Sequence, residues 1–249
     1  MKPIHACLIL LTWGAASGQP AAVAPHFEVA SVKRAEGGGP PGDIPRNMDN
    51  SPGHFAMHNV PMRYALEWAY DLKDYEISGP DWIKFEDRYD IVAKAAGPAS
   101  EEQTRQMLQT LLTERFQMKL HREKKDLSVY VLVPGKGAAK VKEAAGDGPS
   151  ITSGPNGATF HKFPISRLTF LLTRRLDRPV LDLTGLTGTY DYTIDLSGLN
   201  NAVIKEGEET TGPSIFTAVQ RDLGLKLESR KHAIEILVLD SLNKAPTEN

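Results

Sequence analysis

The sequence predicts an α+β fold of two repeated modules, each with the order strand–helix–strand–strand–helix–strand–strand and each with small mixed sheets. Three pairs of similar segments predict the repeat: Lys119–Val133 with Lys226–Leu239, Arg88–Val92 with Thr189–Thr193, and Val60–Arg63 with Phe163–Ser166. The first pair is offset by 107 positions and the second by 101. Similarity at a nearly constant offset indicates a duplicated supersecondary unit, and such units more often bind than catalyse.

The N-terminus has the features of a signal peptide. Lys2 supplies a positive charge, Ala6–Trp13 is an apolar run too short to cross a bilayer, and Ala16–Gly18 offers small residues for cleavage. The alternative is an apolar first strand of a cytosolic protein, which would not need this order of regions. We expect residues 1–18 to be removed and the mature chain to be exported, to the periplasm or the extracellular space.

The composition argues against several classes of protein. Cys7 is the single cysteine among 249 residues and lies within the signal peptide, so the mature chain has no thiol for a disulfide, a nucleophile or a metal site. The formal net charge of −2 gives no electrostatic footprint for nucleic acid. No later segment approaches the roughly 20 apolar residues of a membrane helix. We expect no nucleic-acid partner and no transmembrane segment after cleavage.

Residues 19–52 are expected to hold an N-terminal strand, Phe27–Lys33, and a Gly/Pro-rich loop before the first module, residues 53–134. In this module Pro61 begins a helix, where its missing N–H is harmless. Ser100 and Gln103 match the capping box that begins a second helix. The predicted strands are Gly53–Met57, Tyr75–Ser78, Arg88–Ala95, Met118–Arg122 and Leu127–Val133, with the last two forming a hairpin.

Residues 135–156 are rich in glycine and proline and are expected to be a linker, followed by the second module, residues 157–249. Pro164 begins its first helix, and Gly224 is placed to end its second helix in the left-handed conformation. Leu225–Arg230 and Ile234–Leu239 are expected to form a hairpin, and Ser197–Pro213 a polar loop. Six apolar residues drawn from both modules are expected in the core: Leu111, Phe116, Val131, Leu172, Val219 and Ile236.

Five motifs in order resemble a large family of exported proteins of unknown function that is abundant in soil acidobacteria. They span nearly the whole mature chain: Phe27–Lys33, Ile77–Trp82, Leu111–Glu123, Asp182–Asp191 and Leu223–Ser229. The resemblance implies no catalytic residues, because none are known for that family. In some architectures its members follow a membrane metallopeptidase of the penicillin-sensing antirepressor type, which implies a sensory role.

A weaker resemblance is to the short N-terminal domains of secretins and TonB-dependent receptors, here in tandem. It rests on the order of strands and helices, on Val60–Pro61 before a helix, and on the Leu223–Leu225 turn. A likeness of topology does not establish function. What it implies is protein–protein contact in the cell envelope.

The sequence predicts no catalytic, cofactor or metal site. Ser241–Lys244 has the Ser-x-x-Lys spacing of penicillin-interacting enzymes, but the partner motifs are missing. His54 and His58 fall on a predicted strand, where four residues span about 13 Å, so they do not share one ion without a bend. Glu86–Asp87 is interpreted as a charged turn, with an acid/base pair or calcium loop as the alternative. We predict that the protein is not an enzyme and that it needs no cofactor.

A basic cluster on the first hairpin is the candidate binding site. Arg122, Lys124 and Lys125 are its core, echoed by Lys226, Arg230 and Lys231 in the second module. Such residues commonly keep a strand edge from pairing with itself, and here they can also attract an acidic protein or an anionic cell-wall polymer. The preferred function is a non-catalytic binding module for an envelope protein or the cell wall. The alternatives are a sensory ectodomain working with a membrane metallopeptidase and a secreted hydrolase.

Overall fold

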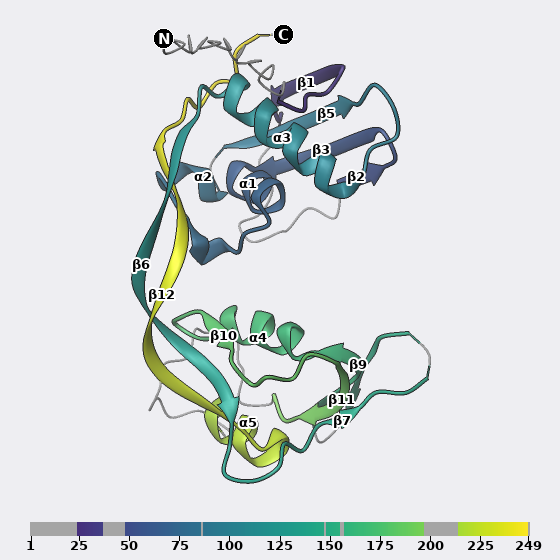
Figure 1. Cartoon of the computed structure of the whole chain (residues 1–249), viewed down its shortest axis with the longest axis vertical. Coiled ribbons are helices and arrows are strands. Elements are labelled where there is room, and N and C mark those ends of the chain that lie inside the picture. Colours follow the sequence, from purple (N-terminus) through teal and green to yellow (C-terminus); the bar gives the residue numbers. More distant parts are fainter. Residues whose placement is uncertain are drawn as a thin grey trace, which may run out of the picture. The chain divides into compact units, whose positions relative to one another are not determined.

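The structure is a computed structural model, and it describes residues 24–36, 48–85, 87–146, 148–154, 157–196 and 214–248. Within these ranges, five α-helices and twelve strands form a mixed α+β fold with three four-stranded sheets (Figure 1). The chain divides into two compact units. The first holds the described parts of Met1–Tyr70, Lys84–Gln117 and Asn243–Asn249, and the second holds Asp71–Ile83 and Met118–Leu242. The predicted signal peptide and the acidic loop at residues 197–213 lie outside the described residues.

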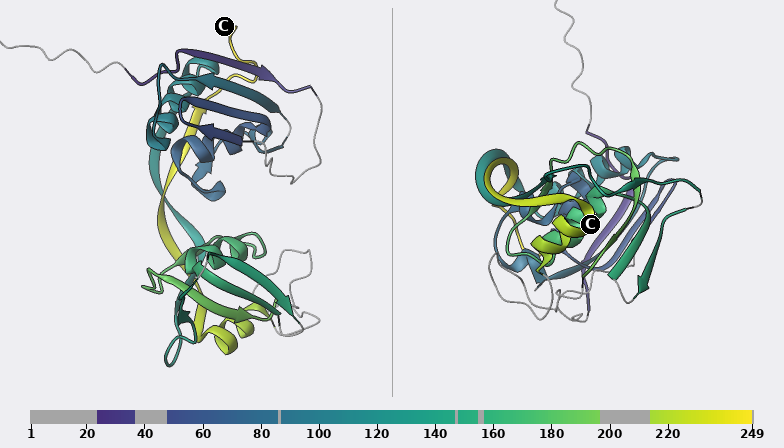
Figure 2. Two further views of the ribbon diagram at one scale, coloured as in Figure 1. Left: turned by 90° about the vertical axis from the view of Figure 1, so that its right-hand side faces the viewer. Right: turned by 90° about the horizontal axis from the view of Figure 1, so that it is seen from below.

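The first unit is an antiparallel sheet with two helices against one face (Figure 2). The strand order is β1 (Val29–Arg34), β5 (Arg88–Lys94), β3 (His54–Pro61) and β2 (Met48–Ser51). Helices α1 (Met62–Tyr70) and α3 (Glu101–Arg115) carry their apolar residues at helical spacing. Alternate residues of β5 are buried, so one face of the sheet joins those helices in a core: Tyr89, Ile91 and Ala93.

The second unit contains a similar antiparallel sheet. Its order is β7 (Lys142–Glu143), β11 (Thr189–Ile194), β9 (Gly157–Pro164) and β8 (Ser150–Gly154). Helices α4 (Ile165–Thr173) and α5 (Ile215–Leu223) pack their apolar faces into one core with this sheet. Phe160 is at the centre of that core, stacked on Tyr192 and edge-on to Phe163.

The third sheet is built around two very long strands, β6 (Lys119–Pro134) and β12 (Leu225–Ser241). They pair antiparallel along their whole length and coil around each other, and we call this pair the ribbon (Figures 1 and 2). Two short strands run parallel to its outer edges: β10 (Val180–Asp182) beside β6, and β4 (Ile77–Ser78) beside β12. The short helices η1 (Asp74–Glu76) and α2 (Trp82–Phe85) flank β4 along the chain.

The two predicted hairpins are wrong. Each pair of predicted strands is one continuous strand, and β6 pairs with β12 instead of folding back on itself. The polar run between Arg122 and Leu127 looked like a turn because it interrupts the apolar pattern. It is extended because it pairs residue by residue with β12, and the inward backbone groups of both strands are hydrogen-bonded across the ladder.

The predicted linker also contains regular structure. Strand β7 pairs with β11, and β8 pairs with β9 in a register that places Gly154 opposite Gly157. Both strands are exposed and short of apolar residues, which is why the composition alone indicates a loop. The bounds expected for the two modules, 53–134 and 157–249, divide the chain differently from its two compact units.

Several local predictions are confirmed. The Ser100 hydroxyl accepts a hydrogen bond from the Gln103 amide at 3.2 Å, and the Gln103 side chain accepts one from the Ser100 amide at 2.9 Å, which completes the capping box. All six residues expected in the core are at most 6% exposed. Strands and helices also follow in the same order from β3 to β6 and from β9 to β12.

Gly224 ends α5 with φ 64° and ψ 17°, as predicted, and its position is tightly enclosed. A Cβ there would lie 2.7 Å from the carbonyl oxygen of Ala138. Gly224→Ala should therefore lower the free energy of unfolding by about 1–3 kcal/mol, from left-handed strain and the clash together. Gly97→Ala is the matched control, because nothing lies within 4 Å of its Cβ position. Equal chemical-denaturation midpoints for the two variants would contradict the prediction.

Candidate functional site

The outer edge of β6 presents unpaired backbone groups. The Tyr130 amide donates to the Pro179 carbonyl at 2.8 Å, and the Leu132 carbonyl accepts from the Leu183 amide at 2.9 Å. The backbone N–H and C=O groups of the even-numbered residues of β6 therefore point away from β12. Backbone groups of successive strand residues point to alternate sides, and the register with β12 is unbroken through this stretch. The same outward orientation therefore holds for four residues that β10 does not reach: Arg122, Lys124, Asp126 and Ser128.

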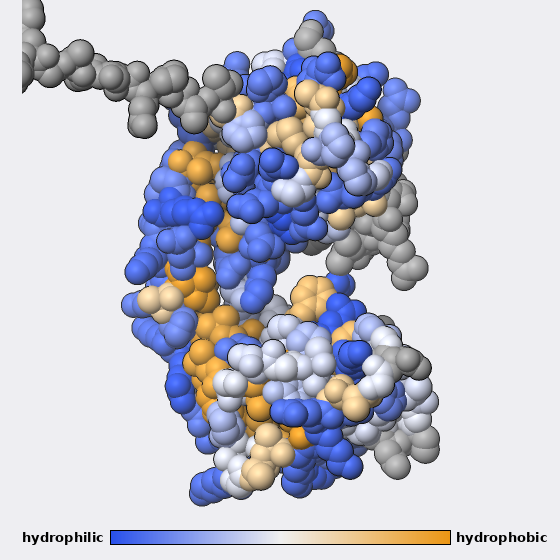
Figure 3. All heavy atoms as spheres, turned by 45° about the vertical axis from the view of Figure 1, so that its right-hand side comes forward, coloured by the Kyte–Doolittle hydropathy of each residue, from blue (hydrophilic) through white to orange (hydrophobic). Residues whose placement is uncertain are grey.

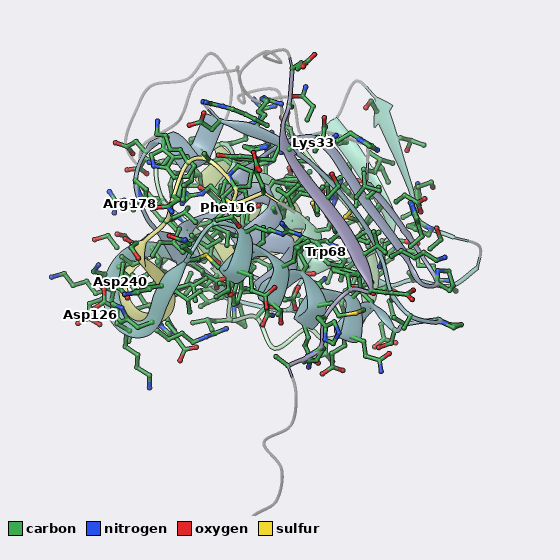
Figure 4. All side chains as sticks on the ribbon, turned by 90° about the horizontal axis from the view of Figure 1, so that it is seen from above. Lys33, Trp68, Phe116, Asp126, Arg178 and Asp240 are labelled. Carbon is green, nitrogen blue, oxygen red and sulfur yellow. The ribbon has the colours of Figure 1, made fainter. Side chains whose placement is uncertain are left out.

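We call these four residues the β6 edge. No strand of the described chain pairs with them on the side away from β12, and all four side chains are exposed. Figure 4 shows Asp126 on the outside of the ribbon, directed away from it. An edge of this length offers four N–H and four C=O groups to an added strand.

The three predicted binding residues lie together on this strand but not on one face. Arg122 and Lys124 share the face on which all residues of the β6 edge lie, whereas Lys125 points to the opposite face. Arg122 pairs with Glu235 at 2.6 Å and Lys125 with Glu123 at 2.9 Å. Within the described residues Lys124 has no ion pair, so of the three it is the cation left to meet an outside charge.

The opposite face of the ribbon carries an apolar cluster beside charged side chains such as Glu123 and Lys125. Val129 and Val131 from β6 form a buried cluster with Ile234 and Ile236 from β12, next to Tyr75 and the partly buried Leu127. Charged and strongly apolar surface consequently lie side by side along the ribbon (Figure 3). A strand added to the β6 edge would meet polar side chains on one face and Leu127, with the Glu123–Lys125 pair, on the other.

Asp87 is the most buried carboxylate in the first unit and is held by two cations. Its side chain is 2% exposed, and it pairs with Arg34 at the end of β1 and with Lys244 at 3.3 Å. Glu86, its proposed partner in an acid/base pair, lies outside the described residues. A carboxylate enclosed by an arginine and a lysine acts as a structural anchor, since both cations stabilise its charged form.

The same anchor ties the C-terminal segment to the first unit. The Asn243 amide donates to the Phe116 carbonyl at 2.9 Å, and the Thr247 amide to Arg115 at 2.7 Å. The Tyr89 hydroxyl donates to the Lys244 carbonyl at 2.7 Å. Residues 243–248 therefore form part of this unit, and they are far from it in the sequence.

One carboxylate interaction occurs twice and was missed from the sequence. Asp90 accepts a hydrogen bond from the Asn59 amide at 2.8 Å, and Asp191 accepts one from the Lys162 amide at the same distance. Asn59 and Lys162 both have positive φ, at 55° and 57°, where their strands bulge. The sequence feature that could have predicted this repeated hydrogen bond is the motif His-x-Val/Phe-Pro, which occurs at residues 58–61 and again at 161–164.

Histidines accompany both of these carboxylates without forming a metal site. His58 lies 3.7 Å from Asp90 and His161 lies 3.9 Å from Asp191, and all four side chains are well exposed. Among the described residues no group of three or more His, Cys, Asp or Glu is placed to hold a metal. Two ligands at these distances fall short of the set that a structural or catalytic ion needs.

An open depression of 440 Å³ lies in the first unit beside the start of α3. Small apolar residues line most of it, from Ala24–Pro25 and Ala95–Ala99, and Gln103 and Gln106 supply amides. Within this lining His26 is the one titratable side chain, so the depression holds no acid–base pair. The depression has room for a ligand, but its lining supplies no pair of reactive side chains.

The described residues form a mixed α+β protein with an exposed, polar stretch of strand edge on β6. In the part of the chain that the structure describes, no helix has the length and apolar character to cross a membrane. Residues 63–242 match the family model DUF3738, and the chain belongs to this family of proteins of unknown function. Neither the curated proteins nor the solved structures contain a match to it.

Proposed function

We propose that this protein is an exported, non-catalytic binding module that holds an extended segment of a partner protein along the β6 edge. The observation that carries the proposal is the run of four residues with outward, unpaired backbone groups and exposed side chains, Arg122 to Ser128. Main-chain hydrogen bonds to such an edge provide affinity that does not depend on the partner's sequence. Side chains then select the partner.

Export rests on the order of charged, apolar and small residues before Gln19. The partner is accordingly an envelope protein, in the periplasm or outside the cell. Expression in a bacterium should yield a secreted protein whose first residue is Gln19, as read by N-terminal sequencing. A full-length product in the cytosolic fraction would contradict export.

The module is proposed to be duplicated, with residues 53–134 and 157–249 as the two copies. Three features support this: the common order of elements, the two carboxylate–amide bonds at the bulges, and the mirrored pairing of β4 and β10 with the ribbon. Each copy supplies one long strand to the ribbon, so neither could complete its sheet alone. Superposition of Val60–Ile91 on Phe163–Tyr192 in an experimental structure tests the duplication.

Lys124 gives the edge a preference for acidic partners. Its ammonium group stands among the outward residues without an ion pair in the described chain, and a lysine at such a position also discourages pairing with a second copy. An acidic side chain directly opposite Lys124 would lie about 5 Å from it across the new ladder. Attraction of this kind is weakened by salt, because the site is exposed.

Reversing the charges of Arg122, Lys124 and Lys125 to glutamate should weaken partner capture from an envelope extract at least about tenfold at low salt. The melting temperature should change little, since all three side chains are exposed. The matched control reverses three exposed cations elsewhere, Lys33, Lys136 and Arg174. Full retention of every partner by the first variant would exclude the β6 edge as the contact surface.

An anionic cell-wall polymer is the competing ligand, because charge alone would attract it. The Asp126→Pro variant separates the two. Proline removes an outward N–H and obstructs the edge while leaving the inward ladder intact, so it should abolish strand addition to the β6 edge. Polymer binding needs no edge and would persist in that variant.

A further inference from the structure

The ribbon has a second open edge, on β12. Leu237 pairs with Ile77 of β4, so its backbone groups point away from β6. Because the register with β6 is unbroken from here to Leu225, the backbone groups of the other odd-numbered residues of β12 in this stretch also point away from β6. Four of them lie beyond the reach of β4 and are exposed: Ser229, Lys231, Ala233 and Glu235. We call these four residues the β12 edge. Arg178 donates a hydrogen bond to the Ser229 hydroxyl at 2.8 Å. This bond involves the side chain of Ser229 and not its backbone groups.

The two edges are equivalent position by position. Asp126 lies opposite Ala233 in the ladder, and these residues are 107 positions apart, the same offset that relates the repeated segments. Each residue of the β6 edge is likewise 107 positions before one of the β12 edge. The parallel strands obey the same relation, because β10 meets Tyr130 and β4 meets Leu237. An approximate two-fold axis therefore passes through the Asp126–Ala233 pair.

The charge pattern is repeated at the centre of each edge. Lys231 occupies the position on β12 that Lys124 occupies on β6, and neither has an ion pair among the residues described. The neighbouring cations of β12 are already satisfied, since Arg230 and Lys226 lie 2.5 Å and 3.2 Å from Glu228. Hydrogen bonds from Arg230 and Lys226 hold the pKa of Glu228 below its ordinary value. Each edge thus has near its middle one lysine without an ion pair among the described residues, although Asp126 lies on the β6 edge and Glu235 on the β12 edge.

We propose that the chain holds two acidic partner strands at once, one on the β6 edge and one on the β12 edge. This inference rests on the proposed function and adds its stoichiometry and its recognition pattern. Because β6 and β12 are antiparallel, the two bound strands run in opposite directions, related by the axis through Asp126 and Ala233. The arrangement fits two copies of one segment, as a two-fold symmetric partner would present them.

The faces of the ribbon specify the pattern of that segment. A residue directly opposite Lys124 or Lys231 projects to the polar face. Its neighbours project to the other face, where Leu127 of β6 and Ile234 of β12 lie among charged side chains such as Lys125 and Arg230. Acidic and apolar residues should therefore alternate. One face of the bound segment then carries its acidic side chains, and the other face carries its apolar side chains.

The probe is an acetylated and amidated octapeptide that alternates glutamate with valine, added to the full mature chain at low salt. Two peptides should bind per chain by native mass spectrometry. Amide exchange of Lys124 and Lys231 should slow at least tenfold in the presence of the peptide. Both are outward amides without a strand partner in the described chain, so they start unprotected.

Proline variants assign the two sites. Asp126→Pro should leave one bound peptide and protection at Lys231, Ala233→Pro should leave one and protection at Lys124, and the double variant should bind none. Slow exchange of the inward amides of Lys125 and His232 shows that the ladder is intact in each variant. If a proline variant fails to fold, the wild-type exchange data decide on their own.

One bound peptide with protection at Lys124 alone would overturn the two-strand inference and leave the proposed function standing. Protection at Lys231 alone would overturn both, since the β6 edge would then be inactive. Protection at neither lysine would also overturn both. Two bound peptides whose number is unchanged in both proline variants would show that binding occurs away from the edges, which refutes both as well.

Discussion

Replacing Phe116 by alanine should lower the free energy of unfolding by about 3–5 kcal/mol. The Phe116 side chain is fully buried, and its ring lies edge-on to Tyr89 with centroids 5.0 Å apart. Its backbone also ends α3 and accepts the hydrogen bond from Asn243 that begins the C-terminal segment. The substitution leaves a cavity at the point where helix, sheet and C-terminal segment of the first unit meet.

Phe170→Ala is the matched control for this prediction. Phe170 is 46% exposed on α4, with the guanidinium groups of Arg167 and Arg174 near its ring. Its removal should change the free energy of unfolding by no more than about 0.5 kcal/mol. Denaturant melts of both variants give the comparison, and a Phe116→Ala loss below about 1 kcal/mol would show that the cavity collapses.

Two buried tyrosines should make the fold sensitive to alkali. Burial raises the pKa of Tyr89 and of Tyr192 from 10 to about 12, with Arg34 and Arg167 respectively opposing part of the shift. The folded state keeps each phenol proton up to about pH 12, whereas the unfolded chain releases it near pH 10. Each group's contribution to stability is thus fully present below pH 10 and is lost between pH 10 and 12, roughly 2–3 kcal/mol per tyrosine.

Phenylalanine variants separate the two tyrosines. The Tyr192 hydroxyl is buried with no hydrogen-bond partner among the described residues, so Tyr192→Phe should be neutral or stabilising at pH 7. Tyr89→Phe loses the bond to the Lys244 carbonyl and should cost about 0.5–1.5 kcal/mol. Either change should roughly halve the loss above pH 10 in melts followed across pH. An unchanged alkaline loss in both would place its cause elsewhere.

Local signals predicted the helices well because their causes are local. The capping box of α3 needs only Ser100 and Gln103, and the end of α5 needs only a glycine that tolerates positive φ. The core residues also followed from spacing, since a buried helix face repeats every three to four positions. These features depend on residues fewer than about ten positions apart.

The ribbon could not be read in this way because its pairing is long-range. The polar run Glu123–Asp126 breaks the apolar alternation of β6, and a second polar run, Glu228–His232, breaks that of β12 at a different place along the ladder. A hint was present: neither strand contains the glycine, or the asparagine–glycine pair, that a tight hairpin turn favours. The repeat offset of 107 was a second clue, because it identifies the two strands as equivalent, although only Asp126 and Ala233 both correspond and face each other.

The three candidate binding residues lie on one strand, β6, as expected from their closeness in sequence, but the geometry around them depends on the ribbon. Arg122, Lys124 and Lys125 were chosen for charge, and two of them are paired with neighbouring glutamates. Which backbone groups point outward follows from the contacts of β10 with Tyr130 and Leu132, and these are set by the fold rather than by the sequence of β6. Whether this edge binds a partner stays a prediction.

The pairing of β6 with β12 also sets the order of events in folding. Strand β6 leaves the ribosome about a hundred residues before β12, and until β12 follows, its inward backbone groups have no partner. Closing so long a loop is slow, and an unpaired strand that ends in the apolar run Val129–Val133 is prone to aggregate. A chain that is exported unfolded and completed before it folds avoids that hazard. Truncation before Leu225 should therefore yield insoluble protein rather than a folded half.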